Sequence, residues 1–160
     1  MITGFIFSIY AYKNNYSSVI NFKNNEIIID DYVGDIKIIK REQNIIKYSN
    51  NVEVETISDK VNISSIKKHN LDAIKIIYKD EIFIDISDSI GKITSDLENN
   101  SKINIDDFIG DIKIKTSSNV SLQRDDIIGS VSMKNINKES DKTINIYISN
   151  LLGKIKISGR

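Results

Sequence analysis

Residues 106–135 read DDFIGDIKIKTSSNVSLQRDDIIGSVSMKN, and one phrase occurs in this stretch twice, nineteen residues apart. The phrase consists of two aspartates, an apolar residue, isoleucine and glycine, followed by alternating apolar positions. A chain repeats itself in this way when each repeat occupies the same place in successive units of one architecture. The repeat therefore predicts stacked structural units.

The dominant local period in the sequence is two. Apolar and polar residues alternate in five short segments, residues 81–87, 102–106, 110–115, 143–149 and 153–158. Such alternation is typical of strands that bury one face, and the abundant isoleucine and valine favour strands because their side chains are stiff at the first torsion. We therefore expect an all-β domain built from short strands.

Glycines mark the longer period. Gly34, Gly91, Gly110 and Gly129 are separated by 57, 19 and 19 residues, and 57 is three times 19. Gly153 follows 24 residues after Gly129, which predicts an excursion within residues 135–142 (NINKESDK). We interpret the five glycines as structural repeat corners of a β-solenoid, or of stacked short β-strand repeats, with a period of about 19 residues. Sheets of repeated hairpins stay open as an alternative.

Apolar columns accompany the five glycines. Two positions after each glycine lie Ile36, Ile93, Ile112, Val131 and Ile155; immediately before it lie Val33, Ile90, Ile109, Ile128 and Leu152; seven positions before it lie Ile27, Ile84, Ile103, Leu122 and Ile146. Each repeat cannot bury its own apolar face and must lay it on its neighbour. We expect all three columns to serve this stacking.

Aspartates precede the predicted corners, and Asp106, Asp107, Asp125 and Asp126 form two such pairs. Aspartate before a corner bonds its own backbone and tolerates turn geometry, and this is our preferred interpretation. Rows of carboxylate oxygens are also ligands for calcium, so these four residues are weak calcium candidates. A third possibility is an enzyme in which they converge in a cleft, as in hydrolases that act on polysaccharides.

The residue types and their spacing argue against catalytic and metal-binding sites. The chain has a single histidine, His69, and no cysteine, so we expect no metal site of zinc type. No serine stands at motif spacing from a histidine or lysine base, and no glycine-rich phosphate loop is present. We therefore expect no catalytic residue, no cofactor and no enzyme activity.

The chain carries 22 basic and 22 acidic residues, a formal net charge of zero. No overall field then attracts nucleic acid or an anionic membrane, and we expect no nucleic-acid partner. Lysines next to the predicted corners, such as Lys37, Lys113 and Lys156, are expected to neutralise a neighbouring row of acids. Compensating ladders of charge would explain the zero balance.

We divide the chain into an apolar N-terminal segment, residues 1–20, and a β-repeat domain, residues 21–160. The apolar run at residues 2–12 is shorter than the roughly 20 residues that a spanning helix needs. It is expected to form a cap strand of the stack or a membrane-associating tail, and the distal end of a signal anchor is a further alternative.

The segment GDIKIK (residues 110–115), the following TSSNVSL and the recurring corner resemble the bacterial putative adhesin family of β-strand repeat domains. The resemblance covers about residues 27–160, although aspartate pairs replace the serine run that leads into the glycine in that family. It implies a cell-envelope or surface protein without established catalysis. The chain is also similar in size and repeat style to bactofilins, which are cytoplasmic β-helical proteins that polymerise end to end.

We therefore expect a non-enzymatic scaffold or adhesion-type interaction domain of a bacterial envelope or surface protein, with an unidentified protein or cell-surface partner. The expected location is the cell envelope or the extracellular face, with the N-terminus as the point of membrane association. The alternative is a cytoplasmic, self-polymerising protein of bactofilin type. In that case the terminal segments GFIFSIY (residues 4–10) and GKIKISGR (residues 153–160) would pair with another copy, because exposed strand edges invite addition.

Overall fold

The computed structural model describes residues 16–68 and 71–160, which form eleven β-strands and no helix. The all-β prediction is confirmed. The strands are β1 (Ser18–Asn21), β2 (Glu26–Asp30), β3 (Val33–Lys40), β4 (Ile45–Tyr48), β5 (Val52–Ile57), β6 (Lys60–Ser65), β7 (Asp72–Tyr78), β8 (Phe83–Asp96), β9 (Lys102–Thr116), β10 (Asn119–Lys134) and β11 (Thr143–Gly159). In this part of the chain, no helix has the length and hydropathy to cross a membrane.

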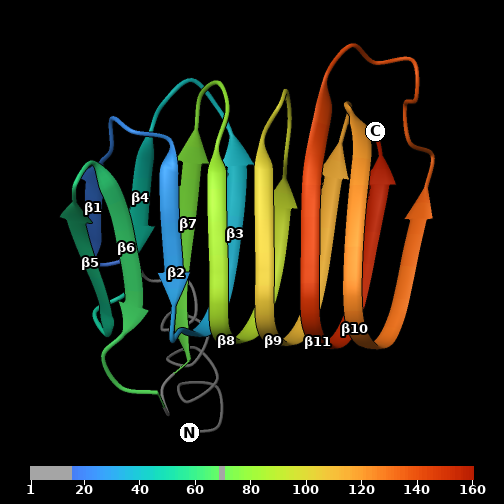
Figure 1. The fold of residues 1–160 in the computed structure, drawn as a ribbon. Coiled ribbons are helices and arrows are strands. Elements are labelled where there is room, and N and C mark those ends of the chain that lie inside the picture. The colour runs from blue at the N-terminus through green and yellow to red at the C-terminus, as the bar shows by residue number, and fades with distance from the viewer. Residues whose placement is uncertain (1–15, 69–70) are drawn as a thin grey trace, which may run out of the picture.

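The four long strands, β8 to β11, bend in the middle and contribute to two layers (Figure 1). The first half of β8 pairs in parallel with β2, and its second half pairs in parallel with β3. β2 and β3 together therefore take the place of one long strand. β6 and β7 do the same, since β6 pairs in parallel with β2 and β7 pairs in parallel with β3. We call each such unit a winding. Figure 1 shows the windings as U-shaped units side by side, with their bends at the bottom.

The two layers are named here by their strands. The front layer contains β2, β5, β6 and the first halves of β8 to β11. The back layer contains β1, β3, β4, β7 and the second halves of β8 to β11. Asn104 lies opposite Asp85 in the front layer, nineteen residues apart, so the period found in the sequence is the offset between β8 and β9.

Windings at both ends of the stack depart from chain order. β11 lies between β9 and β10 and pairs in parallel with both. At the other end, the β6–β7 winding lies outside the β2–β3 winding, which is the earlier one in the chain. The predicted excursion, residues 135–142, is the connection that brings β11 back past β10 (Figure 1).

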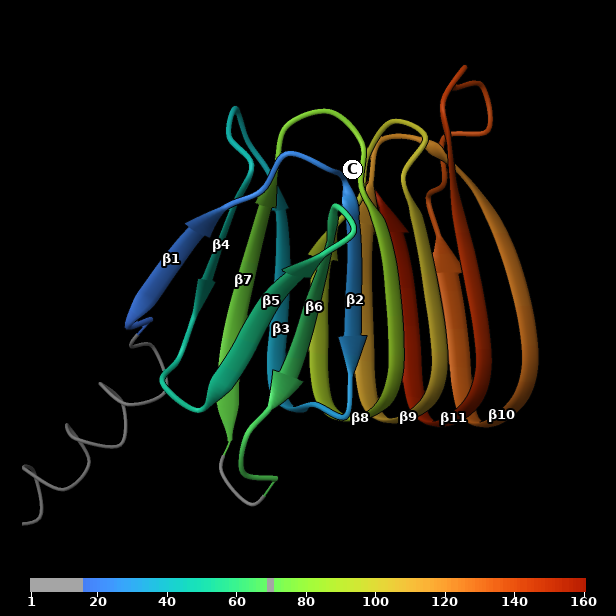
Figure 2. The ribbon, with the colours of Figure 1, turned by 60° about the vertical axis from the view of Figure 1, so that its left-hand side comes forward.

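The two ends of the stack differ in their edges. One end carries antiparallel strands, with β5 beside β6 and with β4 and then β1 beside β7 (Figure 2). At the other end, β10 pairs with β11 alone among the described strands. The expectation that GKIKISGR offers a free edge is therefore wrong, because this segment lies in β11 and is paired on both sides. GFIFSIY, like most of the predicted segment 1–20, lies outside the described residues.

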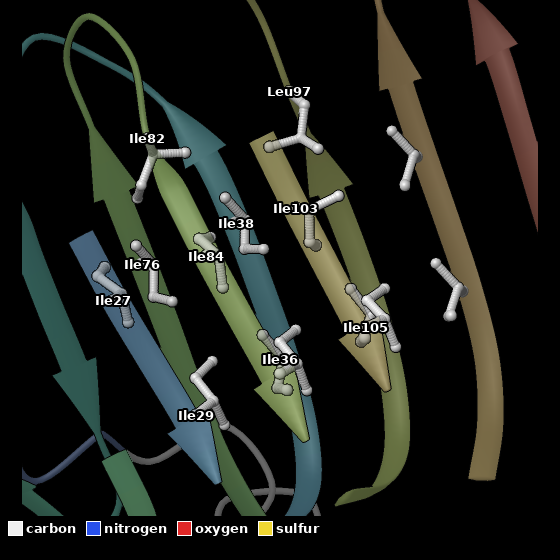
Figure 3. Packing of buried hydrophobic residues seen from close by; sticks show 14 of the residues in the cluster. Ile27, Ile29, Ile36, Ile38, Ile76, Ile82, Ile84, Leu97, Ile103 and Ile105 are labelled. Carbon is white, nitrogen blue, oxygen red and sulfur yellow. The ribbon is translucent and has the colours of Figure 1, made fainter. Parts of the chain in front are cut away.

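Isoleucines fill the space between the layers (Figure 3). Two of the predicted columns lie in this core: Ile27, Ile84, Ile103 and Ile146 in the front layer, and Ile36, Ile93, Ile112 and Ile155 in the back layer, are all buried. Their counterparts in β10, Leu122 and Val131, are only partly buried because nothing described covers this end. The apolar core thus runs the whole length of the stack.

Candidate functional site

The same short bend joins the front and back layers in the five windings that contain a corner glycine. Its first residue has a left-handed backbone, with φ between 45° and 56°. Aspartate and asparagine tolerate this conformation better than most residues. The residues concerned are Asp31, Asp88, Asp107, Asp126 and Asn150. For Asp107 and Asp126 the backbone thus gives a structural reason for their residue type.

The glycine three positions further on also has positive φ, between 141° and 156°. A Cβ atom on Gly110 would collide with the carbonyl group of Gly91 in the next winding, and each of the other corner glycines meets the backbone of a neighbour in the same way. Gly34, Gly91, Gly110, Gly153 and Gly129 lie next to one another in this order. Only glycine fits such a position, because the backbones approach too closely for a side chain.

Carboxylates of the front layer join neighbouring windings. Asp106 accepts hydrogen bonds from the Ser149 hydroxyl and, at 3.1 Å, from the Asn150 amide. Asp85 accepts one from Asn104 at 2.6 Å, and Asp30 accepts one from Ser87 at 2.8 Å. Across residues 16–68 and 71–160, no group of three or more histidine, cysteine or acidic residues is placed to hold a metal ion.

An exposed row of apolar side chains runs along the bends. Ile90, Ile109, Leu152 and Ile128 are neighbours in register, and their exposed fractions are 48%, 48%, 50% and 72%. We call these four residues the bend ridge. They belong to the column immediately before the glycine, which lies in register on neighbouring windings, but the expectation that this column buries an apolar face is wrong.

The residue that precedes each ridge residue in the chain explains why the bend ridge is exposed. Ser89, Phe108 and Leu151 point into the core, and the next residue must therefore point outward. Alternation alone gives opposite answers for the ridge, which lies three positions, an odd number, before the buried column that follows the glycine, and six positions, an even number, after the buried column of the front layer. Beside the ridge, Ile90, Ile109 and Leu152 line a hollow of about 420 Å³ together with polar residues of the bend. Contiguous exposed apolar surface of this kind marks contact sites.

A second hollow, of about 630 Å³, lies on the front layer over β9, β11 and β10. Its lining includes the amides of Asn104, Gln123 and Asn145 and the ring of Tyr147. These groups offer hydrogen bonds and an aromatic edge, and no histidine or cysteine lies among them. Lys102, Asp106 and Ser121 line it as well, so the hollow offers charged and hydroxyl groups to a ligand.

The lysines expected to neutralise the acid row lie on the other layer. Lys37, Lys113 and Lys156 are exposed on the back layer, whereas Asp106 and Asp125 lie on the front layer. The expected compensation within one face is wrong, because the bend between the layers carries the lysines to the opposite side of the core. The zero net charge is a balance between two faces.

No family model matches the sequence, and none of the curated proteins matches it. Among solved structures, a putative cell adhesion protein from Clostridium sporogenes ATCC 15579 superposes with a TM-score of 0.52 at 16% identity, covering 89% of this chain and 98% of that one. This chain has the same fold. The resemblance to adhesin-type repeat domains is thus confirmed at the level of the fold.

Two further solved structures are more distant. A putative adhesin from Parabacteroides distasonis ATCC 8503 has a TM-score of 0.34 at 10% identity, covering 89% of this chain and 93% of that one. A putative adhesin from Bacteroides fragilis NCTC 9343 has a TM-score of 0.32 at 11% identity, with 88% and 95% covered.

Proposed function

We propose that this protein is a non-enzymatic, adhesion-type interaction domain of a bacterial envelope or surface protein, built as a β-solenoid-like scaffold. The bend ridge is the observation that carries this proposal, since four large apolar side chains stand exposed in one line. The fold shared with a bacterial protein named for cell adhesion supports it.

The scaffold holds the bend ridge in a fixed geometry. Ile90, Ile109 and Leu152 are flanked by paired strands on both sides, and the residue before each is buried in the core, whereas Ile128 lies on β10, which is paired on one side among the described strands. A partner that covers the half-exposed side chains of Ile90, Ile109 and Leu152 gains about 1 kcal/mol from each. Little conformational entropy is lost on binding, because the ridge is already ordered. The partner that fits is a protein surface with an apolar strip.

The proposal is tested with the fluorescently labelled full chain on cultured animal cells and on immobilised extracellular-matrix proteins. The double variant Ile109→Ser/Leu152→Ser is expected to lose binding about tenfold or more, as the lost burial implies. The matched control is Val19→Ser/Ile57→Ser, which removes two equally exposed apolar side chains away from the bends. Equal binding by both double variants would refute the role of the ridge.

The cell-envelope location is part of the same proposal. In the producing bacterium, antibodies against the domain should label intact cells, and added protease should remove the label. Labelling that appears only after lysis would place the protein in the cytoplasm and contradict the adhesion role.

Self-association of bactofilin type is a second candidate, favoured by the open edge of β10. This strand of 16 residues has one described neighbour, and most of its side chains are exposed. Unpaired strand edges add further strands readily. Sedimentation of the full chain over a concentration series, with electron micrographs of the same samples, separates the two candidates. Filaments or a growing mass would favour self-association, and an elongated monomer at all concentrations would exclude it.

A further inference from the structure

The two faces of the stack carry opposite charge. Acidic residues dominate the front face, where Glu26, Asp30, Glu53, Glu55, Asp85, Asp106 and Asp125 accompany Lys60 and Lys102. Lysines dominate the back face, where Lys37, Lys47, Lys75, Lys92, Lys113, Lys115, Lys134, Lys154 and Lys156 accompany Asp35, Asp96 and Asp111. Net charge alone conceals this separation.

Five of the back-face lysines form a single row across the strands. Lys47 lies opposite Lys75, which lies opposite Lys37 on its other side. The row continues through Thr94 of β8 to Lys113 and Lys156. We call these five lysines the lysine row. Adjacent strands are about 4.8 Å apart, so the row is roughly 24 Å long.

The lysine row lacks the partners that the front-face carboxylates have. None of its five members takes part in an ion pair within the described ranges, whereas Asp30, Asp85 and Asp106 accept hydrogen bonds from the next winding. Partial burial lowers the pKa of Lys75, and the positive charges of Lys37, Lys47 and Arg41 lower it further. Like charges directly opposite each other destabilise a sheet, so the fold gains nothing from this arrangement.

The positive strip is narrow. On one side of the row, Asp35 and Asp111 alternate with Lys92 and Lys154. On the other side, Asp96 lies opposite Lys115 and forms an ion pair of 3.0 Å with Arg160. A ligand that follows the row meets lysines at nearly every strand, but a ligand that spreads over the face also meets carboxylates.

We propose that the lysine row binds a linear polyanionic glycan, a sugar polymer with repeated carboxylate or phosphate groups, laid across the strands. Charge complementarity supplies the attraction, and the one-dimensional strip selects a linear chain. Lysine binds such groups as a point charge and lacks the two-pronged geometry of arginine. The row therefore selects for the spacing of the anionic groups and tolerates different sugars. A hollow of about 220 Å³ beside Thr94, lined by Tyr16 and Asp35 as well as by Lys37 and Lys92, leaves room for a substituent.

Other anionic partners fit the row less well. Single-stranded nucleic acid is bound through successive aromatic side chains on which bases stack. The row itself contains none, and Tyr16 in the hollow beside it supplies a single ring. A membrane surface is a plane of negative charge, and it would bring anionic headgroups against Asp35, Asp96 and Asp111 as well as the lysines. This inference goes beyond the proposed function, because the lysine row and the bend ridge lie on different surfaces and each can fail without the other.

The test measures binding of the full chain to polygalacturonate, a linear carboxylated glycan, at low ionic strength and over a salt series. Neutral dextran, oligothymidylate and vesicles of phosphatidylglycerol are the comparison ligands. The variant Lys37→Gln/Lys75→Gln/Lys113→Gln removes the centre of the row. The control Lys60→Gln/Lys102→Gln/Lys142→Gln removes the same net charge elsewhere, and thermal melting checks that both variants fold.

We expect polygalacturonate to bind, dextran not to bind, and the affinity to fall steeply as salt rises, because bound counterions are released. The row variant should lose about tenfold in affinity, and its salt dependence should flatten, while the control retains both. The proposal is overturned if polygalacturonate does not bind, if both variants lose affinity equally, or if oligothymidylate or vesicles bind more tightly than polygalacturonate.

Discussion

Single residues decide the bends, and the corner glycines are the clearest case. In Gly110→Ala, the new Cβ would collide with the backbone of Gly91, and φ at this position is 141°. The structure cannot relieve the collision at a low cost in free energy, because the colliding atoms belong to the backbone of the next winding. We expect the free energy of unfolding to fall by at least about 2 kcal/mol in urea titrations.

The control for this substitution is Ser130→Ala, at an exposed position of β10 next to a corner glycine. It should change stability by less than about 0.5 kcal/mol. Equal stability of the two variants would contradict the close approach of the windings at Gly110.

Two buried tyrosines make the fold sensitive to alkali. Burial raises the pKa of Tyr32, and the nearby carboxylates of Asp72 and Asp35 raise it further. Burial likewise raises the pKa of Tyr78, whose hydroxyl donates to the Asp96 carbonyl at 2.8 Å and accepts from the Glu98 amide at 2.9 Å. Both rings therefore stay neutral in the fold well above their usual pKa of about 10.

The direction of the pH effect follows from these raised pKa values. The stability contributed by the neutral tyrosines is complete below about pH 10, and above it the unfolded chain ionises while the folded chain does not. Stability should then fall by about 1.4 kcal/mol per pH unit for each tyrosine. Urea titrations at several alkaline pH values measure this slope.

Tyr78→Phe removes one of these ionisations, so the slope should shrink by about 1.4 kcal/mol per pH unit. The variant should also be less stable at neutral pH, because the Asp96 carbonyl and the Glu98 amide lose their partner. An unchanged alkaline slope would contradict the assignment to Tyr78.

Among the strands, position in the stack determines how much a core residue contributes. Ile146 of β11 and Leu122 of β10 are directly opposite each other in the same column, but Ile146 is 1% exposed and Leu122 is only partly buried. Ile146→Ala should cost about 3 kcal/mol and Leu122→Ala about 1 kcal/mol, as cavity and transfer terms scale with burial. Equal costs in urea titrations would show that another chain covers β10 in solution.

The end of the stack depends on the connection between β10 and β11, which leaves one position in the stack free for β11 to occupy. Because β11 lies between β9 and β10, a truncation after Lys142 should do more than shorten the stack. It removes the one described neighbour of β10. We therefore expect β10 to lose its strand structure and β9 to become the edge of the stack. Hydrogen exchange should show rapid exchange throughout residues 119–134.

A matched control keeps β11 and lengthens the excursion at residues 135–142 with glycine and serine. This insertion should preserve exchange protection in β10, because surface loops tolerate extra length at small entropic cost. Protection of β10 that survives the truncation would instead mean that β10 can pair directly with β9.

The sequence by itself determined the all-β class, the alternating segments, the 19-residue offset between β8 and β9 and the two core columns, while the long bent strands that join these segments were not predicted. Alternation of apolar residues is a local property, and the spacing of 19 residues between Gly91 and Gly110 equals the offset between the neighbouring strands β8 and β9, whereas Gly129 lies beside Gly153. The aspartates at the bends were also accessible, since a left-handed backbone favours them at these positions. Such features depend on residues close together in the chain or on exact repetition.

Only the tertiary structure decided the order of the windings, the open edge and the two charged faces. Parallel windings with the same apolar columns pair equally well in several orders, so the pattern could not reveal that β11 returns between β9 and β10. The bend ridge and the lysine row were hidden for a related reason. Whether Ile109 or Lys113 faces the core, the front or the back depends on where the bend turns the strand, and that turn exists only when the windings are stacked.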